Sequence, residues 1–96
     1  MILHTLAASP SCAAFDNCLR LAAPGDAILL LGDGVYAALA DTGPLAQLAS
    51  CGAEVFMLRA DAAAAGVPAQ AASVTTVDMD GFVALSERFP RQLAWY

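Results

Sequence analysis

Apolar residues follow two alternating patterns along the chain: short continuous runs, and repeats with helical spacing. The continuous runs predict β-strands at 1–6, 27–31, 54–58 and 74–77. Every residue of 27–31 is apolar, which is typical of a strand that is buried on both faces of a parallel sheet. The apolar and aromatic segment 92–96 is expected to dock on the rest of the chain as a last short strand.

Helical repeats separate these runs. The predicted helices span 13–22, 35–40, 44–50, 60–65 and 78–89. In the first of them, Phe15, Cys18 and Leu19 share one face, because they stand three and four positions apart. The segment 41–44 contains both Gly and Pro and is expected to separate the second helix from the third.

The alternation of strands and helices predicts an α/β fold, a three-layer α/β/α arrangement with a mainly parallel sheet of four to five strands. A length of 96 residues suits one domain, so 1–96 is expected to form a single unit. Functional residues of such folds usually lie at the carboxyl ends of the strands. Gly32, Asp33 and Gly34 form a turn at such an end.

The composition is unusually apolar for a small protein. Hydrophobic residues make up 59% of the chain and charged residues only 14%, against about 25% charged in an average domain. Because a small domain has much surface for its volume, part of this surface is expected to be covered by a partner. No apolar run approaches the roughly 18 residues of a membrane-spanning helix. The first basic residue is Arg20, so a signal peptide is not indicated and the cytoplasm is favoured.

Charge and motifs narrow the possible ligands. The net charge is −5, and the four arginines are scattered, so direct binding of nucleic acid is not expected. The Gly32–Gly34 turn matches neither the GxGxxG motif nor a phosphate loop with its lysine. This counts against a free-standing nucleotide-binding domain, which is kept as one alternative. The cysteines Cys12, Cys18 and Cys51 form no CxxC pair and stand apart from the single histidine, so neither a metal nor another cofactor is predicted.

Five segments together resemble the TusB/DsrH family. They are the start 1–6 with Ser9-Pro10, then 18–21 before Gly25-Asp26, then 29–39, then 55–58 with Asp61 and Gly66, and finally 77–85 with the ending 92–95. The third segment is the most specific. Their order and spacing match nearly end to end, which identifies the chain as a member of that family.

The resemblance implies a subunit of a heterohexameric sulfurtransferase complex. Its partners would be two related α/β subunits, one TusC/DsrF-like and one TusD/DsrE-like, with sulfur-carrier proteins reached through the complex. Sulfur would travel as a persulfide, either to the 2-thiouridine of tRNA wobble positions or within dissimilatory sulfur oxidation. In both branches the best-established sulfur-carrying cysteine belongs to a sister subunit.

Cys18 is the candidate persulfide site, because it matches a cysteine typical of the DsrH branch. That match slightly favours sulfur oxidation. Sulfur transfer to it would require an accessible thiol with a lowered pKa. The alternative is a small buried apolar residue, since Cys18 shares a helix face with Phe15 and Leu19. In that case the chain would be a structural, non-catalytic subunit of the same complex.

Four further residues are candidates for the interface with partners. His4 resembles the family's histidine in the first strand and is expected to be a hydrogen-bonded strand residue near an interface. Asp33 could cap the helix that follows it. Trp95 and Tyr96 could serve as core anchors or as interface hot spots. Cys12 and Cys51 match no family motif and are expected to be structural or incidental.

Overall fold

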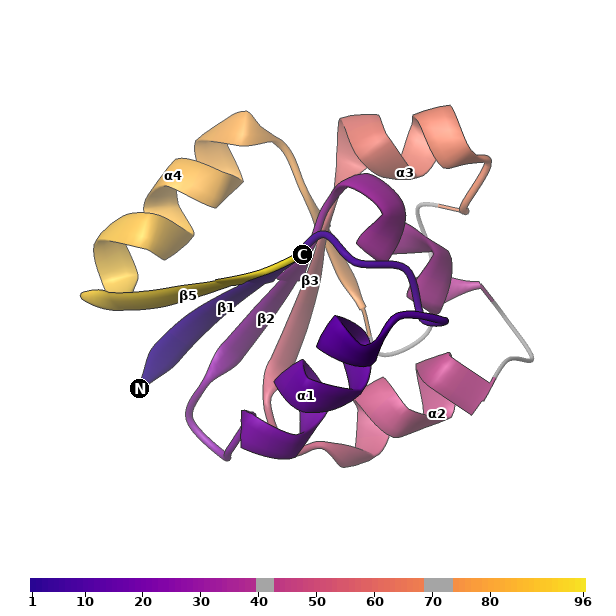
Figure 1. Ribbon diagram of the computed structural model, residues 1–96. Coiled ribbons are helices and arrows are strands. Elements are labelled where there is room, and N and C mark those ends of the chain that lie inside the picture. The colour runs from indigo at the N-terminus through magenta and orange to yellow at the C-terminus, as the bar shows by residue number, and fades with distance from the viewer. Residues whose placement is uncertain (40–42, 69–73) are drawn as a thin grey trace.

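A computed structural model gives the fold of residues 1–39, 43–68 and 74–96 (Figure 1). The elements in chain order are β1 (Ile2–Leu6), α1 (Ala13–Leu21), β2 (Ala27–Leu30), the 3₁₀ helix η1 (Gly32–Ala38), α2 (Gly43–Ser50), β3 (Glu54–Leu58), α3 (Arg59–Ala65), β4 (Thr75–Val77), α4 (Met79–Arg88) and β5 (Arg91–Trp95). The strands form one five-stranded sheet in the order β4-β3-β2-β1-β5, and all neighbours are parallel.

The predicted α/β class and parallel sheet are confirmed, and the sheet has five strands. The tail does dock, since β5 pairs with β1 in parallel along its whole length. One predicted element differs in detail: the turn at 32–34 and the helix after it form a single 3₁₀ helix, η1. The predicted end of that helix at Ala40 and most of the break at 41–44 lie outside the described residues.

The direction of the chain decides which helix covers which face of the sheet. From β1 to β4 each strand is added on the same side of the one before, and after β4 the chain crosses the sheet and adds β5 beside β1. Parallel crossovers are right-handed, so reversing the direction moves the connecting helix to the other face. Accordingly, α1 and α2 lie on one face and α4 on the other (Figure 1).

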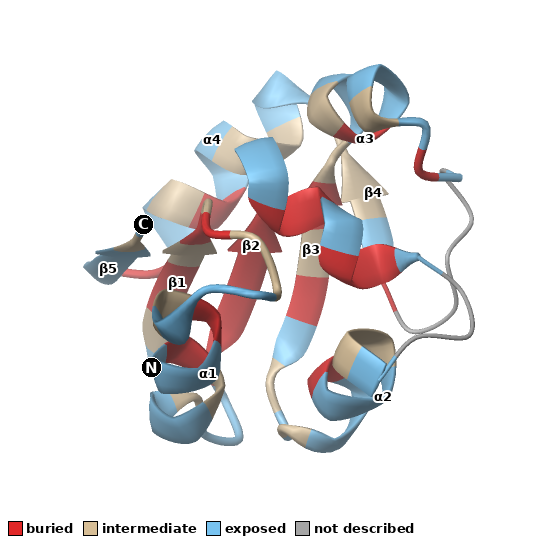
Figure 2. Cartoon of the chain, turned by 45° about the vertical axis from the view of Figure 1, so that its right-hand side comes forward, coloured by how far each residue is buried: buried red, intermediate tan, exposed pale blue. Residues whose placement is uncertain are grey.

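The face under α1 and α2 carries the larger core. Side chains from β1, β2 and β3 pack there with residues of α1, η1, α2 and α3, including Phe15, Val35, Leu48 and Ala62. All four residues of β2 are buried, as expected for a central strand of a parallel sheet (Figure 2). We call this surface the multi-helix face.

The opposite face, which we call the α4 face, has a smaller core. Leu3, Ala27 and Leu29 of the sheet pack there against Leu85 of α4 and against Phe89, the residue that caps the end of this helix. The helix begins at Asp78, whose carboxylate accepts a 2.9 Å hydrogen bond from the backbone N–H of Gly81. One ten-residue helix therefore provides the cover that several elements provide on the other side.

A close contact at Gly34 holds η1 against the carboxyl end of β1. A Cβ atom at this position would lie only 2.1 Å from the carbonyl oxygen of Leu6. Any side chain would therefore push η1 away from the sheet. The preceding Leu31 N–H donates a 3.1 Å hydrogen bond to the same Leu6 carbonyl, which fixes the loop from the other side.

Candidate functional site

Cys18 lies inside the core of the multi-helix face. Its exposed fraction is 0%, and it packs in the same cluster as Phe15 of α1 and Leu48 of α2. Burial raises the pKa of the Cys18 thiol to about 12, with a further contribution from nearby Cys51. At neutral pH the side chain is therefore an uncharged thiol, and the attacking species in sulfur transfer is the thiolate.

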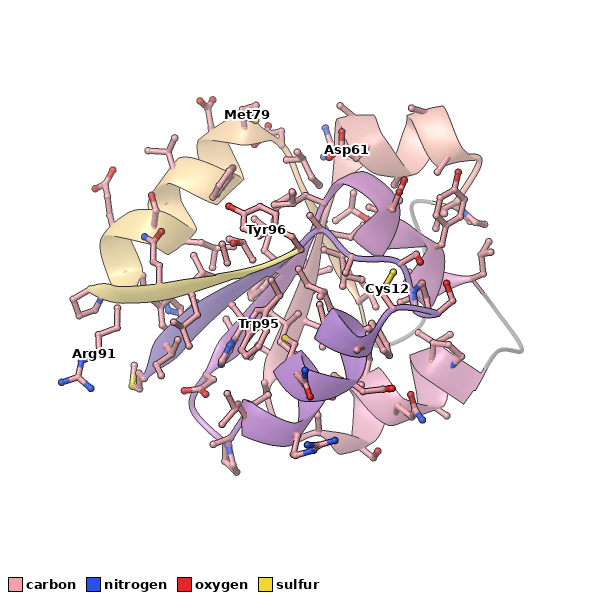
Figure 3. The ribbon with its side chains drawn as sticks, viewed as in Figure 1. Cys12, Asp61, Met79, Arg91, Trp95 and Tyr96 are labelled. Atoms are coloured by element: carbon pink, nitrogen blue, oxygen red, sulfur yellow. The ribbon has the colours of Figure 1, made fainter. Side chains whose placement is uncertain are left out.

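The other two cysteines differ in exposure from Cys18. Cys51 is half-buried at the end of α2, and its thiol donates a 3.1 Å hydrogen bond to the Leu48 carbonyl. Cys12 is exposed just before α1, with its sulfur 3.4 Å from the Ser9 hydroxyl oxygen (Figure 3). Exposure therefore ranks the three thiols in the order Cys12, Cys51, Cys18, and the candidate persulfide site is the least accessible.

His4 is the centre of a hydrogen-bonded chain of three side chains. The indole Nε1–H of Trp95 donates to His4 Nδ1 across 3.1 Å. His4 Nε2 lies 3.1 Å from Asp26 Oδ2 on the other side. The His4 side chain is fully buried, and the rings of His4 and Trp95 are stacked with centroids 6.2 Å apart. The expectation of a hydrogen-bonded strand residue at position 4 is thus met, with both ring nitrogens paired.

The Asp26 carboxylate binds the start of β1 and the turn after α1 as well as the histidine. Its Oδ1 accepts the Ile2 N–H at 2.9 Å, and its Oδ2 also accepts the Ala23 N–H at 3.1 Å. Burial works against ionisation of this carboxyl, but the hydrogen bonds from His4, Ile2 and Ala23 outweigh it and lower the pKa of Asp26 below its usual value. The carboxylate is therefore charged at neutral pH and fully engaged.

Asp33 does not cap the following helix. It lies within the first turn of η1, the N-cap position belongs to Leu31, and no side chain caps it. Asp61 on α3 contacts this loop instead: its Oδ2 accepts the Gly32 N–H at 2.8 Å. A hollow of about 200 Å³ between η1 and α3 is lined by Asp33, Asp61 and Tyr36.

A larger groove lies at the carboxyl ends of β3 and β4, the region where the fold class predicts function. It encloses about 540 Å³ between the starts of α3 and α4 and is mostly apolar. Its lining includes Leu58, Arg59, Met79 and Asp80. Figure 3 shows Met79 at the start of α4 and Asp61 at the start of α3, on the same side of the molecule. Cys18 does not line this groove.

The two C-terminal aromatic residues have different environments. Trp95 is half-buried against the core of the multi-helix face, so it acts as a core anchor. Tyr96 is 87% exposed and Leu93 is 43% exposed. Residues 91–94 of the edge strand β5 are all exposed (Figure 2). Trp95 thus holds the strand in place, while Tyr96 stays available as a candidate contact with a partner.

Two residues of these arrangements were missed by sequence reasoning. Asp26 and Asp61 enter the predictions from sequence only as parts of the segments that carry the family resemblance. The available signal for Asp26 was its position directly before a wholly apolar strand, where a carboxylate needs a partner. No signal in the sequence connects it with His4 and Trp95, because β1 and β5 are brought together only by the topology.

Among residues 1–39, 43–68 and 74–96, no three His, Cys, Asp or Glu side chains group as metal ligands would. Within the same ranges, no helix combines the length and the apolar character needed to cross a bilayer.

The fold and its buried polar chain define a small, wholly parallel α/β protein. A family model described as DsrH like protein matches residues 8–92. Protein TusB of Pectobacterium parmentieri is 41% identical over 95 residues, covering 98% of this chain and 100% of that protein. Protein TusB of Erwinia tasmaniensis is 41% identical with the same coverage. Protein TusB of Escherichia coli K12 is 38% identical over 95 residues, again with the same coverage.

The chain therefore belongs to the TusB/DsrH family. This membership confirms the family that the five sequence segments indicated. It supports a role as a sulfur-relay subunit.

Proposed function

We propose that the chain is a subunit of a heterohexameric sulfurtransferase complex that relays persulfide sulfur. The observation that carries this proposal is the family match over 8–92, together with full-length relatives at about 40% identity. Its proposed partners are a TusC/DsrF-like and a TusD/DsrE-like subunit, and the complex as a whole meets the sulfur-carrier proteins. The proposed location is the cytoplasm, and 1–96 is proposed to act as one domain.

The chemistry of the relay is a transfer between thiols. An acceptor thiolate attacks the terminal sulfur of a donor persulfide, a new S–S bond forms, and the donor's S–S bond breaks. The donor leaves as a thiolate, so the reaction needs no outside oxidant or reductant. The acceptor must therefore present an accessible thiolate to the donor protein.

A structural role for this chain is the second candidate, and the burial of Cys18 favours it. The thiol is fully buried with a pKa raised to about 12, so attack would require both the opening of the core and ionisation. A subunit that holds its partners in place needs neither step. Sulfur acceptance by Cys18 stays a hypothesis, which requires α1 to expose the thiol in the complex.

Co-expression with the two partner subunits tests the complex. The chain carrying an affinity tag is expected to retain both partners in equal amounts through size-exclusion chromatography. A stable isolated monomer under these conditions would contradict the proposal. Cys18→Ser then separates the two roles: sulfur transfer by the assembled complex falls if Cys18 carries sulfur and is unchanged if the chain is structural. Cys12→Ser is the matched control.

The final sulfur acceptor is a separate question, and the matched relatives named Protein TusB favour the tRNA branch. Mass analysis of tRNA from a strain lacking this chain tests that choice. Loss of 2-thiouridine, restored by the wild-type chain, is the expected result. Retention of 2-thiouridine would point to sulfur oxidation instead.

A further inference from the structure

The chain of hydrogen bonds from Trp95 through His4 to Asp26 determines where the histidine carries its proton. An indole nitrogen is only ever a donor, so His4 Nδ1 must accept from it and is unprotonated. The single proton of the neutral ring is then on Nε2, which donates to the Asp26 carboxylate. These two hydrogen bonds therefore require the neutral imidazole with its proton on Nε2.

We propose that His4 is a proton-operated latch for the C-terminal strand β5. Uptake of a second proton puts an N–H on Nδ1, directly opposite the indole N–H of Trp95. Two donors then face each other at a distance of 3.1 Å and the hydrogen bond is lost. The protonated ring keeps its partner on the other side, because the Asp26 carboxylate can pair with imidazolium.

The charged surroundings of His4 permit this change. The ionisable groups on the elements that pack against this face of β1 are Asp26 before β2, Arg91 on β5, and Asp16, Cys18 and Arg20 on α1. Asp26 is the only one that bonds to the ring among the described residues. Cys18 is uncharged, since its pKa is raised to about 12. The other three are exposed to solvent, where screening is strong.

Release of Trp95 would act on a strand at the edge of the sheet. β5 is an end strand, its sole strand neighbour in the described sheet is β1, and four of its five residues are exposed. The backbone link at its far end is the 2.9 Å bond from Ala7 N–H to the Trp95 carbonyl. Proton uptake at His4 would therefore loosen the edge strand and its exposed residues Leu93 and Tyr96, while the central strands stay paired. This inference does not depend on the sulfur-relay role.

The tautomer can be measured directly, because His4 is the only histidine of the sequence. Nitrogen-15 spectra of the imidazole in the full-length chain at pH 8 are expected to show a protonated Nε2 and an unprotonated Nδ1. A proton on Nδ1 at pH 8 would overturn the proposal without any variant having to be made.

The coupling is then measured as the pH is lowered from 8 to 5, with the nitrogen-15 signals of His4 reporting its protonation directly. As His4 takes up its proton, emission from Trp95, the only tryptophan, is expected to shift to longer wavelength. Exchange protection of the Ala7 amide is expected to fall about tenfold over the same interval. The Leu31 amide, which donates to Leu6 between β1 and β2, is the internal control and keeps its protection.

Variants separate the latch from general acid unfolding. Trp95→Phe is expected to abolish the pH dependence of Ala7 protection, and Tyr96→Phe is expected to keep it. Protonation of His4 with unchanged Trp95 emission and unchanged Ala7 protection would refute the latch. Equal and simultaneous loss of protection at Ala7 and Leu31 would also refute it, because the whole sheet would then be unfolding.

Discussion

The two faces of the sheet carry hydrophobic cores of different size. Among the described residues, fifteen buried side chains form the cluster of the multi-helix face and five form that of the α4 face. The multi-helix face encloses Cys18, and the polar chain of His4 and Trp95 lies on the same side. On the α4 face, Met79 and Val83 of α4 are 59% and 51% exposed. The side that carries the candidate chemistry therefore has the larger core, although Leu21 of α1 on that side is also 59% exposed.

This difference bears on the excess of apolar residues in the sequence. A small domain that needed no partner would place more polar residues on a helix such as α4. The exposed apolar residues of α4 and of the edge strand β5 offer a surface that the expected partner could contact. The core residues around Cys18 are buried and offer no such surface. Each of the following predictions tests this contrast, from the largest effect to the smallest.

Truncation of one phenylalanine on each face gives the largest effect. Phe15 and Phe89 are both buried, with exposed fractions of 1% and 0%. Replacement of either by alanine is expected to lower the free energy of unfolding by about 3–5 kcal/mol. Phe15→Ala should cost more, because α4 alone can settle toward the sheet while the packed elements over Phe15 cannot. Urea unfolding of both variants measures this, and an equal or greater cost for Phe89→Ala would contradict the contrast.

Removal of the Asp26 carboxylate should have the next largest effect. Asp26→Ala leaves the buried His4 Nε2–H and the N–H groups of Ile2 and Ala23 without their acceptor. A loss of about 2–3 kcal/mol in the free energy of unfolding is expected. Asp16→Ala, at an exposed position of α1, is the control and should change it by less than about 0.5 kcal/mol. A small loss for Asp26→Ala would mean that water replaces the carboxylate.

The same carboxylate makes stability depend on pH in the acid range. Its pKa is lowered in the folded state, so its contribution is present above the ordinary aspartate pKa and is lost as the pH falls through the folded value. The free energy of unfolding of the wild type should therefore decrease with acidification below about pH 4. Asp26→Asn should show a flatter dependence in chemical unfolding followed across that range. Identical slopes for both proteins would show that Asp26 is not the cause of this pH dependence.

The smallest effect is expected at Cys18. Replacement by alanine removes one sulfur atom from a packed core, which should cost about 1 kcal/mol. Cys12→Ala, at an exposed position, should cost close to nothing. Thermal unfolding compares the two variants. If Cys18→Ala is as harmless as Cys12→Ala, the core around α1 is looser than the burial indicates.

Much of the fold could be predicted from local pattern, but the pairing of distant residues could not. The wholly apolar run became the central strand β2, and the aromatic tail docked as β5. The spacing of Phe15, Cys18 and Leu19 placed Cys18 on the inward face of α1. These outcomes depend on periodicity and burial, which act within a few residues.

The hydrogen-bonded chain of His4, Asp26 and Trp95 could not be predicted from such a local pattern. In the sequence, Asp26 is 22 positions away from His4, and Trp95 is 91 positions away from it. They meet because the chain crosses the sheet after β4 and adds β5 beside β1. This strand order follows from the packing of the whole chain. The predicted capping role of Asp33 was wrong for a local reason. The helix η1 begins at Gly32, three residues before the predicted start at Val35, which leaves Leu31 at the N-cap and Asp33 inside the first turn.

The central claim is that this chain serves a sulfur-relay complex while its own Cys18 stays part of a closed core. Mass analysis of intact subunits and of their peptides, from the complex after loading by its sulfur donor, tests this most directly. The prediction is an added sulfur atom on a partner subunit and none on the peptide that contains Cys18. An added sulfur on Cys18, removable by a thiol reductant, would contradict the claim and make this chain a sulfur carrier.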